Sequence, residues 1–202
     1  DTDELNLTLD NGSKWVGAAI SNVDADADLY DRSTNSIWPG SVVNKNTGYL
    51  IGKSVYQSGL FDVALNNGSE WDTTKSSIID NLTVNNKSQV NVADSGLLAD
   101  NISLSEQSSL KVAAHGIVYT DALNLNSGSK ATLTEETATV YANTITVGSG
   151  SELNLGAGQV DTHNMVLTDD GTFNIGSREF VLNADMNNAR DKTTVDYVYD
   201  RG

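Results

Sequence analysis

The chain contains one serine with neighbours that could support nucleophilic catalysis. Asp94-Ser95-Gly96 supplies the hydroxyl, and His115, one repeat further along, supplies a candidate base. A serine nucleophile needs a positioned base and an oxyanion hole. Glycine is missing before Asp94, and a chain of this pattern has no room for a two-barrel protease domain. We therefore interpret Ser95 as part of a polar turn.

A second group consists of alternating carboxylates that resemble the start of a calcium loop. They are Asp24, Asp26, Asp28 and Asp31. A complete loop of this type has a glycine at its sharp turn and a glutamate at its twelfth position, where this chain has Asn35. The run is a weak calcium candidate, and a solvated acidic loop is the alternative.

The remaining titratable residues do not form a recognisable catalytic or metal-binding pattern. His115 and His163 have no cysteine partners and no metal-ligand spacing. The paired carboxylates Glu135-Glu136 would suit a polysaccharide lyase or hydrolase, but the twelve lysines and arginines are scattered along the chain. We expect no enzyme activity, no resident metal and no cofactor.

Composition restricts the classes of partner and of fold. The formal charge is −15, which disfavours nucleic acid because phosphate is repelled. The single proline and the abundance of Asn, Ser, Thr, Asp and Gly favour β-structure with many tight polar turns. The chain has no cysteine and no apolar run long enough for a membrane-spanning helix.

The positions of apolar pairs reveal a repeat. From Trp71, the pair after each polar turn recurs at steps of 19, 20, 21, 22 and 20 residues, and the pair before each turn keeps the same steps. A third, looser track begins at Ile78-Ile79. Alternating residues point to opposite sides of a strand, and no segment shows a helical apolar stripe. The pattern therefore predicts three short strands in each unit. The apolar side of a unit can be buried only when the unit stacks on its neighbours.

The predicted fold is an all-β, right-handed parallel β-helix with coils of about 19–22 residues. A leucine-rich repeat shares this period but requires a helical or apolar outer segment, whereas residues 88–94 alternate like a strand. We expect Val84 to stack on Ile102, and Ile102 on Leu123 and Ile145. The predicted core stack comprises Val63, Val84, Leu104, Leu125, Val147, Leu167, Trp71, Val90, Leu110, Leu133, Leu153 and Phe173.

The repeat divides the chain into four parts. Residues 1–16 form a first coil, because Leu9 to Trp15 nearly copies Leu65 to Trp71. Residues 17–60 form irregular coils or, as we favour, a protruding loop. Residues 61–182 form six regular coils, and residues 183–202 a capping segment. The irregular part carries aromatic candidates for interaction with a partner, namely Tyr30, Trp38, Tyr49 and Tyr56.

The combination of an L-x-N-G-S-x-W segment with a following S-x-I-x-x-L-x-V-x-N segment resembles the passenger domains of bacterial autotransporters. It is similar to the pertactin-like and AIDA-type adhesins of type V secretion. The first segment corresponds to Leu65–Trp71 and recurs at Leu9–Trp15, and the second corresponds to Ser77–Asn86. The segment from Asp170 to Phe173, with Asp185 and Asp191-Lys192, looks like the C-terminal passenger coils that include the autochaperone.

The resemblance implies a non-catalytic stalk at the bacterial surface, exported through the periplasm and outer membrane by a barrel of the same polypeptide. It implies adhesion, aggregation or display of a virulence factor, with a surface protein or glycan of a host or sister cell as partner. The last coils would promote folding after export, and an excised fragment would be monomeric. The alternative is a carbohydrate-active β-helix such as a lyase, a hydrolase or a phage tail-spike.

Overall fold

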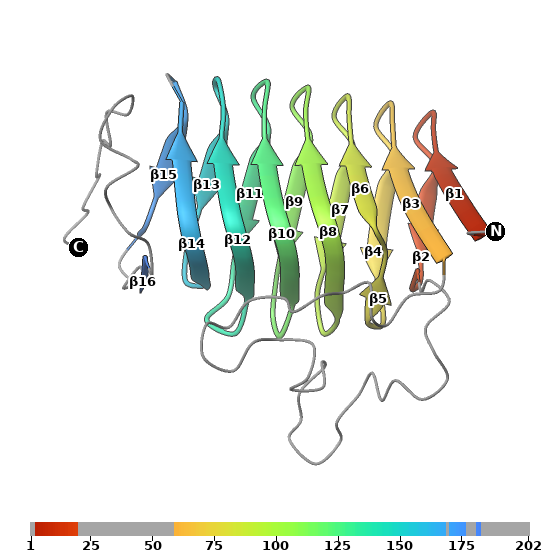
Figure 1. The fold of residues 1–202 in the computed structure, drawn as a ribbon, viewed down its shortest axis with the longest axis horizontal. Coiled ribbons are helices and arrows are strands. Elements are labelled where there is room, and N and C mark those ends of the chain that lie inside the picture. Colours follow the sequence, from red (N-terminus) through yellow and green to blue (C-terminus); the bar gives the residue numbers. More distant parts are fainter. Residues whose placement is uncertain (1–2, 20–58, 169, 177–180, 183–202) are drawn as a thin grey trace, which may run out of the picture.

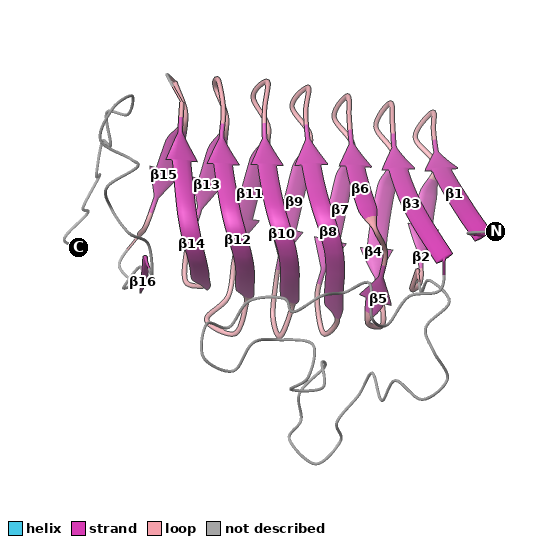
Figure 2. Cartoon of the chain, in the orientation of Figure 1, coloured by secondary structure: helices cyan, strands magenta, loops and turns pink. Residues whose placement is uncertain are grey.

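The computed structural model describes residues 3–19, 59–168, 170–176 and 181–182. Within these ranges the chain forms strands joined by turns, with no helix, and every strand pair is parallel (Figures 1 and 2). Since no helix occurs there, none of the described segments is a helix able to cross a membrane. The architecture is a parallel β-solenoid, as the repeat predicted.

Two sheets form opposite walls of the solenoid. Neighbouring strands of the first wall, here called sheet A, come from successive coils. In spatial order these strands are β1 (Asp3–Leu9), β3 (Gly59–Leu65), β6 (Asn81–Val84), β8 (Gly96–Leu104), β10 (Ile117–Leu125), β12 (Thr139–Val147), β14 (Gln159–Leu167) and β16 (Val181–Leu182), with β5 (Ser77–Ile78) beside β8.

Sheet B forms the second wall with one short strand from each coil. Its strands are β2 (Lys14–Val16), β4 (Glu70–Thr73), β7 (Gln89–Val92), β9 (Ser109–Val112), β11 (Lys130–Leu133), β13 (Glu152–Asn154) and β15 (Thr172–Asn174). In Figure 1 the chain rises through sheet A at the front, descends through sheet B behind it, and advances from right to left. This winding is right-handed, as parallel crossovers favour.

The three expected strands per coil are joined into two. Each of β8, β10, β12 and β14 is nine residues long and combines the third strand of one coil with the first strand of the next. The corner between them remains as an interruption in pairing, since Thr120 pairs with Ala142 and Ala122 with Thr144, while Asp121 is passed over. An extended chain with a local break in the ladder at Asp121 and Asn143 therefore joins the two segments.

Apolar side chains stack in columns between the walls. All twelve residues of the predicted core stack are buried. The strand register corrects two details of their arrangement. Val84 pairs with Leu104, not Ile102, and it is Leu82 that pairs with Ile102. Spacing alone did not separate these choices, because both residues of each apolar pair repeat at equal steps.

The same register assigns two residues to neighbouring columns. Val63 lies in the column of Leu82, whereas Leu65 lies in the column of Val84, which Leu9 begins. Leu133 pairs with Val112, and Ala131 takes the place between Leu110 and Leu153. The small Ala131 remains 1% exposed in that column, so interior position and not side-chain size defines the stack.

Left-handed backbone at the turns keeps the coils hydrogen bonded to one another. Asn67 and Gly68 have φ of 54° and 75°, and Lys87 has φ of 62°. The amide of Gly68 donates to the carbonyl of Asn86 at 2.9 Å, and that of Lys87 to the carbonyl of Glu106 at 2.9 Å. The inter-coil ladder therefore continues around the turn, which explains why positive φ persists where the residue is not glycine.

The first coil stacks directly on the coil that begins at Gly59. β1 pairs with β3 over their whole length, and β2 pairs with β4 with Trp15 opposite Trp71. In both walls, the paired strands of these two coils are separated in the sequence by residues 20–58. The described part of the first coil ends at Ala19, and the next described residue is Gly59, the first residue of β3.

Candidate interaction surface

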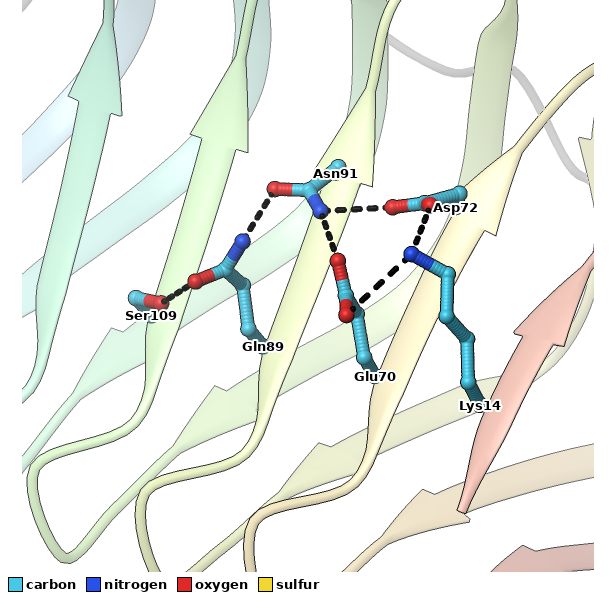
Figure 3. A network of polar contacts seen from close by, with 6 residues as sticks. All are labelled: Lys14, Glu70, Asp72, Gln89, Asn91 and Ser109. Carbon is cyan, nitrogen blue, oxygen red and sulfur yellow. Dashed lines mark hydrogen bonds and ion pairs between the residues drawn. The ribbon is translucent and has the colours of Figure 1, made fainter. Parts of the chain in front are cut away.

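Polar side chains on the outer face of sheet B join neighbouring coils. The ammonium group of Lys14 lies 2.7 Å from a carboxylate oxygen of Asp72 and 3.3 Å from one of Glu70. Asn91 continues the network by donating to Asp72 at 2.6 Å and to Glu70 at 3.0 Å (Figure 3). Gln89 donates to Asn91 at 2.7 Å and accepts from the Ser109 hydroxyl at 3.4 Å.

This network affects the ionisation of its charged members. Hydrogen bonds from Lys14 and Asn91 lower the pKa of Asp72. Hydrogen bonds to the carboxylates of Asp72 and Glu70 raise the pKa of Lys14. Further along the same wall, Lys130 lies 3.1 Å from Glu152 and lowers the pKa of that carboxyl group. These contacts hold coils in register, but they do not set a group at the neutral pKa typical of an acid–base catalyst.

Amide ladders run along the outer face of sheet A and along the turns. Asn81 donates to Asp62 at 2.8 Å, and Asn101 donates to Asn81 at 3.0 Å. At the turn, Asn67 donates to Asp10 and Asn86 to Asn67, both at 2.6 Å. Both of these ladders donate toward the N-terminal coil and end there on an aspartate, Asp62 or Asp10, which as a carboxylate only accepts.

Two tyrosines stack outside the core near the starts of β10 and β12. The rings of Tyr119 and Tyr141 have centroids 4.8 Å apart and planes within 9° of parallel. Burial raises the pKa of both phenols. Sequence analysis did not single out this pair. The available signal was that both residues directly follow an interior valine, at equivalent positions of successive coils.

The serine and histidine considered for catalysis do not come together. Ser95 is 2% exposed, and its hydroxyl lies 2.5 Å from that of Thr73, inside the solenoid. The ring of His115 is directed to Asp94, with Nδ1 3.1 Å from Oδ1, and both side chains are largely exposed. A hydroxyl that faces the interior and a base that faces solvent cannot act on one substrate bond.

The other titratable candidates are likewise dispersed. Glu135 and Glu136 are exposed at a turn, and His163 lies within β14 on sheet A. Among the residues that the structure describes, no three histidine, aspartate or glutamate side chains are grouped as metal ligands would be.

The candidates between the first two coils lie outside the described residues. This applies to the calcium candidates and to the aromatic interaction candidates, which are Asp24, Asp26, Asp28, Asp31, Tyr30, Trp38, Tyr49 and Tyr56. The proposed capping segment, residues 183–202, also lies outside them. Their roles stay predictions.

Comparison with known proteins places the repeat in a family. Residues 1–74 match the family described as "Autotransporter YaiT, N-terminal passenger repeat". That description names an N-terminal repeat, whereas the resemblance found in the sequence had suggested a C-terminal passenger region. No solved structure matches the chain significantly.

Two curated relatives match almost the entire chain. YaiT of Salmonella typhimurium (strain LT2) is 46% identical over 221 residues, which cover 98% of this chain and 23% of the relative. YaiT of Escherichia coli (strain K12) is 47% identical over 210 residues, which cover 93% of this chain and 22% of the relative. The chain thus spans less than a quarter of the length of these relatives. The matched passenger repeat, the two relatives and the parallel solenoid together identify this chain as autotransporter passenger sequence that is similar to part of YaiT.

Proposed function

We propose that this chain is a non-catalytic segment of a passenger stalk that acts in adhesion, in aggregation or in display of a virulence factor. The observation that carries the proposal is the arrangement of the coils. Their interior columns are apolar, and their outer faces are bonded to one another by side-chain ladders such as Asp62–Asn81–Asn101. Such a structure is stiff along its axis and suits a spacer that holds a contact surface away from the cell.

The partner in this proposal is a protein or glycan on the surface of a host or sister cell. The stalk itself is exported through the periplasm and remains on the outer surface, joined to its own barrel. Contact with the partner is made by residues 20–58, because they interrupt a scaffold that is otherwise repetitive. Recognition in solenoid proteins commonly lies in such insertions.

The test uses bacteria that express the complete passenger with its translocating barrel. In one variant a short Gly-Ser linker replaces residues 20–58, and a matched control carries Thr146→Ser on the outer face of sheet A. We expect the deletion to abolish sedimentation of sister cells or attachment to host cells, with surface amount unchanged. Unaltered adhesion in the deletion variant would contradict the assigned contact segment.

The second part of the proposal is that the last coils promote folding after export. Each coil of a solenoid gains most of its burial from its neighbours, so an existing coil lowers the cost of adding the next. Substituting Phe173, a 5% exposed residue of β15, by Asp should then lower the yield of protease-resistant passenger on the cell surface. The same substitution at Val90, a buried residue of an early coil in the same interior column, is the control. Equal yields would refute an autochaperone role.

The alternative function, a carbohydrate-active enzyme, is tested with passenger purified from the same cells. Passenger that releases no new reducing ends from bacterial polysaccharide would exclude that activity. Measurable turnover would instead support the alternative. That assay does not depend on adhesion, so its result is distinguishable from loss of the contact segment.

A further inference from the structure

The chain contains two Asn-Gly dipeptides, and they lie at equivalent turns of adjacent coils. They are Asn11-Gly12 and Asn67-Gly68, and a serine follows each of them. The strands before and after the two turns pair in register. Both asparagines have φ of 54°. The two turns therefore share sequence and backbone conformation, and a difference in their reactivity must come from their surroundings.

An Asn-Gly dipeptide can modify itself without an enzyme. The main-chain nitrogen of the glycine attacks the side-chain carbonyl carbon of the asparagine. A C–N bond forms, and the side-chain nitrogen leaves as ammonia together with the proton of the glycine amide. Water then opens the resulting succinimide at either carbonyl group, which leaves aspartate or isoaspartate. Glycine favours this attack because it has no side chain to hinder the close approach of its nitrogen.

Hydrogen bonds hold the side chain of Asn67 at both ends. Its amide nitrogen donates to a carboxylate oxygen of Asp10, and its amide oxygen accepts from the side chain of Asn86, both at 2.6 Å. The attacking nitrogen, that of Gly68, donates to the main-chain carbonyl of Asn86 at 2.9 Å. Three hydrogen bonds between coils must therefore open before the glycine nitrogen can attack Asn67.

The side chain of Asn11 is held much less firmly. Its amide nitrogen lies 3.4 Å from a carboxylate oxygen of the preceding residue, Asp10, and none of the described residues donates to its amide oxygen. The nitrogen of Gly12 donates to the carbonyl of Asn67 at 2.9 Å, and this bond alone ties the reacting groups to the neighbouring coil. Within the described ranges the first coil also has a neighbour on one side only, so its turn opens at a lower cost.

We propose that Asn11 is a site of spontaneous deamidation in the folded solenoid, and that the ladder between coils protects Asn67 from the same reaction. The protection matters because a carboxylate at position 67 would replace the amide that donates to Asp10, and the two like charges would repel within the ladder. Reaction at Asn11 removes only the long contact with Asp10. The inference concerns the chemistry of the turns, and it holds whatever partner the stalk contacts.

The first test follows both dipeptides while the 202-residue chain is incubated in mildly alkaline buffer. Peptide mapping by mass spectrometry measures the conversion of each asparagine, and labelling with an isoaspartyl methyltransferase detects the isoaspartate product. We expect Asn11 to react about tenfold faster than Asn67, because two additional hydrogen bonds must open at Asn67. Equal rates, a faster reaction at Asn67, or an Asn11 that stays intact would each overturn the proposal.

The same chain unfolded in urea is the control for effects of local sequence. Without the fold the two dipeptides should react at similar rates, because each follows a polar residue, Asp10 or Asn66, and precedes a serine. A difference in urea as large as that in the folded chain would assign the selectivity to local sequence and would refute protection by the ladder.

The second test removes one protecting bond from Asn67. Asn86→Asp replaces the amide that donates to Asn67 by a carboxylate, which cannot donate. Asn85→Asp is the matched control, because the side chain of Asn85 donates to Asn66 at 3.2 Å and not to Asn67. Below the thermal unfolding of both variants, we expect Asn67 to deamidate about fivefold faster in Asn86→Asp and at the wild-type rate in Asn85→Asp. Equal rates at Asn67 in the two variants, or an equally large rise at Asn11 in Asn86→Asp, would contradict protection by this bond.

Discussion

Trp15 and Trp71 stack across two adjacent coils, with ring centroids 5.1 Å apart and planes within 8° of parallel. Residues 20–58 separate them in the sequence, yet their strands pair directly. The indole of Trp71 also donates to the carbonyl of Gly17 at 2.9 Å. The near-identical segments that contain these tryptophans are therefore neighbouring layers of one column. This contact fixes the first coil to the remainder of the solenoid.

Trp71→Ala should be among the most destabilising single substitutions in the chain. The side chain is 0% exposed, and loss of a buried aromatic residue typically costs about 3–5 kcal/mol. Trp15→Ala should cost less, since Trp15 is only partly buried at the end of its column. Urea unfolding followed by circular dichroism measures both, and a larger effect for Trp15 would contradict the assigned layer order.

Leu125→Asp should unfold the coils around β10. The side chain is 0% exposed, with Leu104 and Val147 paired on either side, and an unpaired buried carboxylate costs several kcal/mol, about 4 or more. Asn124→Asp, directed outward from the same strand, is the control. Amide exchange should accelerate in β8, β10 and β12 of the first variant alone. A wild-type exchange pattern would show that the register is wrong.

Ser108→Ala and Ser129→Ala should differ although both serines are buried at equivalent turns. The hydroxyl of Ser108 has no hydrogen-bond partner in the described part of the chain, whereas that of Ser129 donates to the carbonyl of Asn126 at 2.6 Å. Removal of an unpaired hydroxyl should be neutral or slightly stabilising, and removal of the paired one should cost about 1 kcal/mol. Equal losses in chemical denaturation would contradict this distinction.

Lys87→Gly should stabilise the solenoid. Lys87 has φ of 62°, a conformation that costs non-glycine residues about 1 kcal/mol and glycine little. The converse change, Gly68→Ala at φ of 75°, should destabilise by strain alone, because a Cβ there meets nothing within 4 Å. Midpoints of denaturation that move in the same direction for both variants would contradict this explanation.

Asp72→Asn should remove a pH-dependent part of the stability. Lys14 and Asn91 lower the pKa of Asp72 below its ordinary 3.8, so its ionised form favours the folded state above that value. This contribution is lost as pH falls through the folded pKa. The difference in melting temperature between wild type and Asp72→Asn should therefore shrink on acidification. Glu106→Gln, at an exposed turn, is the control. A difference that stays constant down to strong acid for Asp72→Asn would contradict the prediction.

Spacing alone was sufficient to predict the solenoid. Two apolar tracks shared one irregular set of steps, and only stacked coils require that shared register. The same logic predicted burial at positions such as Trp71, Leu125 and Phe173, because alternation decides which side of a strand faces inward.

The tertiary structure decided the strand register and the direction of turn side chains, which the local sequence leaves open. Leu82 and Val84 repeat with equal spacing, so only inter-strand hydrogen bonds determine that Val84 lies on Leu104. The distance between Ser95 and a base depends on which way a turn directs its hydroxyl, which periodicity does not specify. The unequal hydrogen bonding of Asn11 and Asn67 became visible only when stacking placed their turns in adjacent coils. Sequence sets the repeat because it is a local alternation, whereas register and outer surfaces arise from pairings between distant segments.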